Sequence, residues 1–134
     1  MNLISVRLIT DHVDRLVDFY TRLTGASVDR PTPDFAELRT PNGTIAIGST
    51  RTVGLFGPGS AEPAANRSAI VELIAEDVDV VHAEVSGWAE VVQAPTYMPW
   101  GNRSLLVRDP DGTLVNVFTP ATDAAREKFA RFSR

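Results

Sequence analysis

Residues 3–25 read Leu-Ile-Ser-Val-Arg-Leu-Ile-Thr-Asp-His-Val-Asp-Arg-Leu-Val-Asp-Phe-Tyr-Thr-Arg-Leu-Thr-Gly, and this stretch decides the fold. Its first part alternates apolar and polar residues through Ile4, Val6 and Leu8, which is typical of a strand with one buried face. The period then changes to that of a helix with one apolar face, formed by Val13, Leu16, Val17, Tyr20 and Leu23. Gly25 is typical of the residue that ends a helix. The stretch therefore predicts a strand followed by a helix.

Short strand candidates follow, separated by turn signals. They are Ala26–Asp29, Phe35–Arg39 and Thr44–Ser49, and Asn42-Gly43 between the last two is a strong hairpin signal. Residues 51–68 have three Gly, two Pro and no clear period, which indicates a crossover loop. We expect its apolar residues Leu55 and Phe56 to dock on another part of the protein. The first half therefore predicts the order strand, helix and three strands.

The second half repeats the first. The segment that starts at Asp11 aligns with the one that starts at Glu76, at an offset of 77 − 12 = 65. Pro41-Asn42-Gly43 aligns with Pro110-Asp111-Gly112, at an offset of 112 − 43 = 69. Two matches in the same order indicate a duplicated unit. We therefore expect one domain, 1–134, with modules 3–50 and 69–120, a crossover loop 51–68 and a C-terminal helix 121–134.

Composition excludes several classes of function. Thirteen Lys+Arg against 17 Asp+Glu give a net charge of −4, which argues against nucleic acid as a partner. The absence of cysteine excludes disulfides and thiolate metal sites. No apolar run reaches the roughly 20 residues that span a bilayer. The first residues lack the pattern of a signal peptide, so we expect a cytoplasmic protein with no membrane partner.

Three segments carry a resemblance to a known family. They are the helix core Val13–Tyr20, the loop Pro99–Arg103, and Asp109-Pro110-Asp111-Gly112 followed by a strand ending at Pro120. Together they resemble the vicinal oxygen chelate superfamily of glyoxalases, bleomycin resistance proteins and extradiol dioxygenases. The resemblance implies an α+β fold of two βαβββ modules. Their curled mixed sheets would surround a funnel-like cavity, in a homodimer.

The resemblance also implies where a metal would be held. In the enzymes of the superfamily, His and Glu side chains on the first and last strands of each module bind a divalent metal. The corresponding positions, taken with the two offsets, are Ser5, Ile47, Ile70 and Asn116. Two of these side chains are apolar and the other two are weak ligands for first-row metals. We therefore expect no metal centre of the family type, and no cofactor.

Arg7 and Glu72 are equivalent under the repeat, since 72 − 7 = 65. Alternation places them on the same side as Ser5 and Ile70. The resemblance implies that the first strands of the two modules lie next to each other, so we expect Arg7 and Glu72 to meet near the cavity floor. One interpretation is a structural ion pair. The other is a functional pair that binds a polar ligand group or carries acid–base catalysis, with Glu72 and Arg7 as the catalytic candidates.

The remaining ligand-binding candidates are aromatic, apolar or basic. We expect Ile45, Ile47, Leu114 and Phe118 to share the cavity-facing parity. Tyr97, Met98 and Trp100 suit contact with a flat apolar ligand, although Trp100 could instead fill a dimer interface. Phe35 could line the pocket or cap the core. Arg103 could reach inward or bridge strands.

Two functions remain open at this stage. The first is a metal-independent, dimeric binding protein similar to the bleomycin resistance branch, which holds a moderately hydrophobic small molecule with an acceptor or anionic group. The second is a glyoxalase-like lyase, isomerase or dioxygenase, either metal-free with Glu72 as base or with an unforeseen metal site. Whether the protein is an enzyme is not decided by the sequence.

Overall fold

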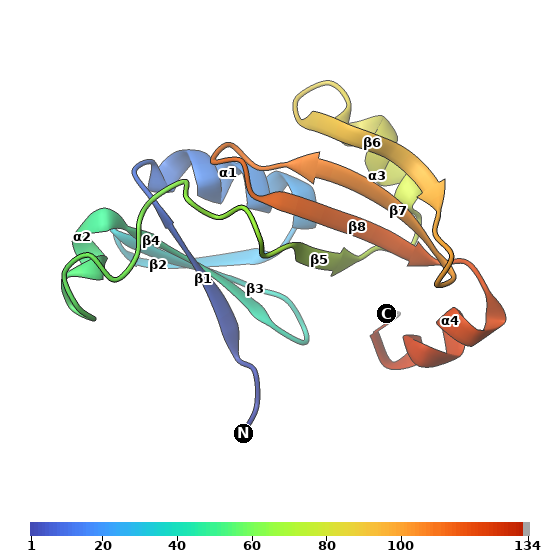
Figure 1. Cartoon of the computed structure of the whole chain (residues 1–134), viewed down its shortest axis with the longest axis horizontal. Coiled ribbons are helices and arrows are strands. Elements are labelled where there is room, and N and C mark those ends of the chain that lie inside the picture. Colours follow the sequence, from blue (N-terminus) through green and yellow to red (C-terminus); the bar gives the residue numbers. More distant parts are fainter. Residues whose placement is uncertain (133–134) are drawn as a thin grey trace. The chain divides into compact units, whose positions relative to one another are not determined.

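The computed structural model describes residues 1–132 and divides the chain into two compact units, Met1–Asn66 and the part from Arg67 onward (Figure 1). Each unit contains a four-stranded mixed sheet and a helix in the order βαβββ. The predicted α+β fold is therefore confirmed. The funnel-like cavity concerns both units together and stays a prediction. Ser133 and Arg134, the end of the predicted C-terminal helix, lie outside the described residues.

The first unit has the sheet order β1-β4-β3-β2, in which β1 and β4 are parallel. The helix α1 ends at Gly25, whose left-handed conformation (φ 66°) lets its N–H bind the carbonyl of Thr21. The short helix α2 was not predicted, because four residues show no period. The elements are β1 (Ser5–Thr10), α1 (Val13–Thr24), β2 (Ser27–Thr32), β3 (Phe35–Arg39), β4 (Thr44–Ser49) and α2 (Thr50–Val53).

Strand register gives the first sheet a covered face and an open face. The covered face packs on α1 through Leu16 and Tyr20, which are almost fully buried. Its strand residues are Ala36, Leu38, Ile45 and Ile47. The open face is the opposite side, defined by Ser5, Arg7, Ile9, Phe35, Ala46 and Gly48.

The second unit repeats this arrangement with the order β5-β8-β7-β6, in which β5 and β8 are parallel. Thr122 caps α4 by accepting a hydrogen bond from the backbone N–H of Ala125. The predicted C-terminal helix is interrupted at Phe129, after which the chain forms a 3-10 turn. The elements are β5 (Val71–Ile74), α3 (Val78–Val85), β6 (Glu90–Tyr97), β7 (Asn102–Arg108), β8 (Leu114–Pro120), α4 (Asp123–Lys128) and η1 (Ala130–Phe132).

The second sheet also has two distinct faces. Val78 and Val85 of α3 are buried against the covered face, whose strand residues are Leu105, Val107, Val115 and Val117. The open face is defined by Glu72, Ile74, Asn102, Ser104, Leu106, Leu114, Asn116 and Phe118. Leu114 and Phe118 therefore share the face of Asn116, as expected.

One prediction about the first sheet was wrong. Ile45 and Ile47 pair with Val6 and Leu8 of β1 and lie on the covered face, and Ile47 is fully buried. The residue that pairs with Arg7 is Ala46. Since Asn116 pairs with Glu72, the equivalent of Asn116 in the first unit is Ala46, at an offset of 116 − 46 = 70.

The reason lies in the two hairpin turns. The first turn closes with a backbone bond from Thr40 to Gly43, and the second with one from Asp109 to Thr113. The second turn is thus one residue longer, so aligning the two glycines shifts the following strands by one residue. In a strand, a shift of one residue moves every side chain to the other face.

Replacement of Ile47 by Ala should lower the free energy of unfolding by about 2–5 kcal/mol, because it opens a cavity between the sheet and α1. Urea unfolding followed by circular dichroism measures this change. As a control, Ile70→Ala removes the same atoms from a side chain that is 50% exposed and should cost about 0.5 kcal/mol. Equal losses in the two variants would contradict the assigned faces.

Candidate functional site

Arg7 lies on the open face of the first sheet, in contact with two aromatic rings. Its guanidinium carbon is 4.6 Å from the ring centre of Phe35 and 5.0 Å from that of Phe56. Such cation–π contacts are worth about 0.5–2 kcal/mol each, depending on desolvation. Phe56 belongs to the loop after α2, and apart from this contact it is 69% exposed, while Leu55 is 87% exposed. The expectation that these two apolar residues are buried against another part of the protein was therefore wrong within the described structure.

The guanidinium of Arg7 keeps its hydrogen-bond donors. Asp14, Asp29 and Asp34 are bound by other arginines, and the described residues of the first unit include no acidic partner for Arg7. A stacked guanidinium uses its flat face for the rings and directs its five N–H groups outward in its own plane. The neighbouring positions Ala46 and Gly48 add little bulk, and a side chain at Gly48 would approach Arg7 Nη1 to 3.8 Å. The arrangement suits an anionic group such as a carboxylate.

Glu72 and Asn116 form the polar pair of the second open face. The Nδ2 group of Asn116 donates a 2.8 Å hydrogen bond to Oε2 of Glu72. Glu72 is exposed, whereas Asn116 is 7% exposed. The expected pairing of Arg7 with Glu72 would join the two units and stays a prediction. Within its own unit, the partner of Glu72 is a neutral amide.

Arg103 and Tyr97 lie on the covered side of the second sheet, because they pair with each other and Arg103 is two residues from the buried Leu105, on the same face of β7. Arg103 binds Asp79 of α3 through Nε (3.0 Å) and Nη2 (2.9 Å), with its guanidinium 4.6 Å from the Tyr97 ring. The hydrogen bond from Arg103 lowers the pKa of Asp79. Arg103 therefore bridges the sheet and α3, rather than two strands of the sheet. A role for Arg103 in ligand binding stays a prediction.

The other candidates are distributed over loops and strand ends. Met98 is half-buried, and Trp100 is 67% exposed, in the loop between β6 and β7. Ser5 is exposed at the start of β1, and Ile70 precedes β5. A role for these residues in ligand binding stays a prediction.

A pocket at the start of α1 was missed by the sequence analysis. It has a volume of about 410 Å³ and is lined by Asp11, His12, Val13, Asp14, Arg15, Arg30, Pro33, Ser49 and Arg51. Its residues come from three separate stretches of the sequence, 11–15, 30–33 and 49–51, and no motif or spacing in the sequence connects them.

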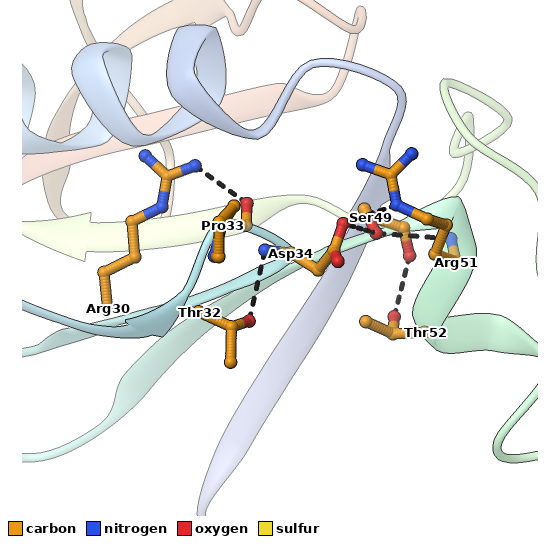
Figure 2. Close-up of polar contacts among 7 residues, drawn as sticks. All are labelled: Arg30, Thr32, Pro33, Asp34, Ser49, Arg51 and Thr52. Atoms are coloured by element: carbon orange, nitrogen blue, oxygen red, sulfur yellow. Dashed lines mark hydrogen bonds and ion pairs between the residues drawn. The ribbon is translucent and has the colours of Figure 1, made fainter.

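Three of the charged residues that line this pocket, Asp14, Arg30 and Arg51, bind other groups of the protein. Figure 2 shows the contacts of Arg30 with Pro33 and of Arg51 with Asp34. Arg30 binds Asp14 and donates to the carbonyl of Pro33 at 2.8 Å. Asp34 accepts hydrogen bonds from Ser49 Oγ and Arg51 Nε, both at 2.8 Å. These bonds, above all the one from Ser49, lower the pKa of Asp34. The network joins the turn between β2 and β3 to the end of β4, and we assign it a structural role.

The residues at the expected metal positions do not fit a metal ion. After the register correction they are Ser5, Ala46, Ile70 and Asn116, and neither Ala46 nor Ile70 has a donor atom in its side chain. Asn116 already binds Glu72 through its amide nitrogen. No group of three or more His, Asp or Glu side chains among residues 1–132 is arranged to hold a metal.

Comparisons with known proteins agree on the family and the fold. The sequence model of the "Glyoxalase/Bleomycin resistance protein/Dioxygenase superfamily" matches residues 2–117. No curated protein matches the chain. Many solved structures are similar, and three of them illustrate the range of the likeness.

A glyoxalase/bleomycin resistance protein/dioxygenase from Nocardioides is 20% identical with a TM-score of 0.74, covering 92% of this chain and 85% of that one. A family enzyme from Burkholderia phytofirmans PsJN is 16% identical with a TM-score of 0.79, covering 90% and 99%. TioX from Micromonospora sp. ML1 is 26% identical with a TM-score of 0.68, covering 90% and 99%.

The Asp34 network predicts a specific acid response. Because the folded-state pKa of Asp34 is lowered, its contribution to stability is present above the ordinary value of 3.8 and is lost as the pH falls through the folded-state pKa. Ser49→Ala should raise the pKa of Asp34, as measured from the carboxyl-carbon chemical shift against pH. Ser86→Ala, on the other unit, should leave it unchanged. An Asp34 titration that is identical in the wild type and Ser49→Ala would contradict the network.

Proposed function

The chain belongs to the glyoxalase/bleomycin resistance protein/dioxygenase superfamily, and we propose that it is a metal-independent member that binds a small organic anion. The observation that carries this proposal is Arg7, stacked on Phe35 and Phe56 with its N–H donors available. Such a site combines an aromatic surface with a cation, so it favours a flat, moderately hydrophobic ligand that bears a carboxylate or a similar acceptor.

The side chains on the two open faces support the proposal that the ligand is bound without a metal ion. A ligand bound by a guanidinium and aromatic rings needs no Lewis acid, and the positions equivalent to the family's metal ligands hold Ser5, Ala46, Ile70 and Asn116. We further propose that the protein acts as a homodimer in the cytoplasm. None of the helices in residues 1–132 is long and apolar enough to cross a membrane.

A metal-free lyase or isomerase is the second candidate function. The observation that favours it is the exposed carboxylate of Glu72, whose partner within its unit is neutral Asn116. An exposed carboxylate can accept a proton from a substrate. Loss of turnover in Glu72→Gln, with binding retained, would identify this activity.

Binding of benzoate tests the proposed function directly, because benzoate has both an aromatic ring and a carboxylate. Benzoate should perturb the backbone amide signals around Arg7 in two-dimensional ¹H–¹⁵N NMR spectra. Arg7→Leu should weaken binding by about tenfold or more, since it removes a charge-assisted bidentate contact. Arg22→Leu, an exposed arginine on α1, is the matched control and should bind benzoate like the wild type.

Two outcomes would contradict the proposal. One is benzoate binding that is equally strong in Arg7→Leu and in the wild type. The other is an equal loss of binding in Arg7→Leu and Arg22→Leu, which would indicate a nonspecific effect of charge.

Removal of metal should not change this binding. Protein treated with a chelator and dialysed should give the same benzoate affinity and the same unfolding midpoint as untreated protein, because no side chain at the four equivalent positions is a strong metal ligand. Elemental analysis of protein purified without chelator should show no stoichiometric transition metal. A stoichiometric metal whose removal abolishes benzoate binding would overturn the proposal.

A further inference from the structure

The open face of the second sheet contains buried hydrogen-bond acceptors without donors. Among the described residues, Asn102 Oδ1, Ser104 Oγ and Asn116 Oδ1 have no hydrogen-bond partner, and each atom is inaccessible. The three residues are 3–7% exposed. Buried polar atoms in proteins are nearly always paired, so each of these atoms calls for an explanation.

Strand register places these acceptors in one row. On β7, Asn102 and Ser104 alternate with side chains of the covered face, and Asn116 on β8 pairs with Leu106. Since Ser104 pairs with Phe118, it is the diagonal neighbour of Asn116 across the two strands. Ser104 and Asn116 are therefore neighbours on the open face.

The orientation of the Asn116 amide follows from its partner. A carboxylate has only acceptor oxygens, so the side of the amide that faces Glu72 Oε2 at 2.8 Å must be the NH₂ group. Oδ1 is thereby turned away from Glu72 and requires an N–H or O–H group. The apolar side chains of this face, Ile74, Leu106, Leu114 and Phe118, have no such group, and neither Asn102 nor Ser104 donates to this oxygen.

The negative charge of Glu72 determines which kind of hydrogen-bond donor suits Asn116 Oδ1 best. Glu72 is exposed beside Asn116, and no ion pair of Glu72 is found among the described residues of the second unit. Three other acidic residues of this unit do form ion pairs: Asp79 with Arg103, Glu90 with Arg108, and Asp123 with Arg126. The unneutralised carboxylate attracts a positive charge, and a protonated amine carries both that charge and several N–H donors.

The face is open on the side of Glu72. At the other end of the row, Phe118 is covered by Phe129, which follows α4, with 5.1 Å between the ring centres. Leu106, which pairs with Asn116, is only half-buried. The Glu72 side is therefore the exposed end of the face, and a ligand that enters there reaches Asn116 Oδ1 only when the neighbouring side chains move.

We propose that the open face of the second sheet holds a subsite for a protonated amine, received by Asn116 Oδ1 and Ser104 Oγ with Glu72 as the counter-charge. This inference goes beyond the proposed function and does not rest on it, since it concerns the second sheet and a ligand group of the opposite charge.

Benzylammonium is the probe that tests the subsite, with toluene and benzyl alcohol as probes of similar shape. In NMR titrations of the full chain, benzylammonium should shift the backbone amides of Ser104 and Asn116 and bind more tightly than the two neutral probes. Asn116→Leu and Glu72→Gln should each weaken benzylammonium binding by about tenfold. Ser104→Ala provides a second, smaller change in case Asn116→Leu does not fold. Glu84→Gln on α3 is the charge-matched control and should bind like the wild type.

The overturning results are equally specific. Equal binding of benzylammonium and toluene would show that the face offers only apolar contact. Benzylammonium binding that is unchanged in both Glu72→Gln and Ser104→Ala would also overturn the proposal. Benzoate titrations of the same samples separate the two ideas. If benzoate binds and benzylammonium does not, only the amine subsite is refuted. If benzylammonium binds and benzoate does not, only the anion site at Arg7 is refuted.

Discussion

In each unit, the parallel pairing of the first strand with the last strand decides which side chains meet the helix and which are left on the open face. In the first unit this pairing joins Arg7 to Ala46, and in the second it joins Glu72 to Asn116. Because side chains alternate along a strand, the register of these pairs determines every other position on the two sheets. The buried Ile47 and Val115 hold the register, since moving either of them to the open face would remove it from the core.

Much of the architecture could be predicted, because it depends on local patterns. The alternation at Ile4–Leu8 and the helical period of Val13–Leu23 are properties of adjacent residues, and the internal repeat extends them to the second unit. The position of Ile47 could not be predicted by aligning glycines, because the two hairpin turns differ by one residue in length. Such a difference is invisible until the backbone bonds of the turns are known.

The candidate site was harder to predict than the fold, because its contacts join residues far apart in the sequence. The aromatic partners of Arg7 come from β3 and from a loop without periodicity, and only the apolar character of Phe56 hinted at a contact. Arg103 belongs to the covered side because Asp79 on α3 binds it in a bidentate pair. The hydrogen bond from Asn116 to Glu72 followed the predicted face of both residues, but the orphaned acceptors beside it could be recognised only from burial.

The two open faces have complementary chemistry, with a guanidinium on the first sheet and acceptors with a carboxylate on the second. We propose that both groups recognise ligands without a metal ion. A crystal structure of the protein grown with benzoate tests this proposal most directly. The account predicts a carboxylate bound to the guanidinium of Arg7, with Phe35 and Phe56 against it. Benzoate bound elsewhere, with Arg7 neutralised by a carboxylate of the protein itself, would contradict the account.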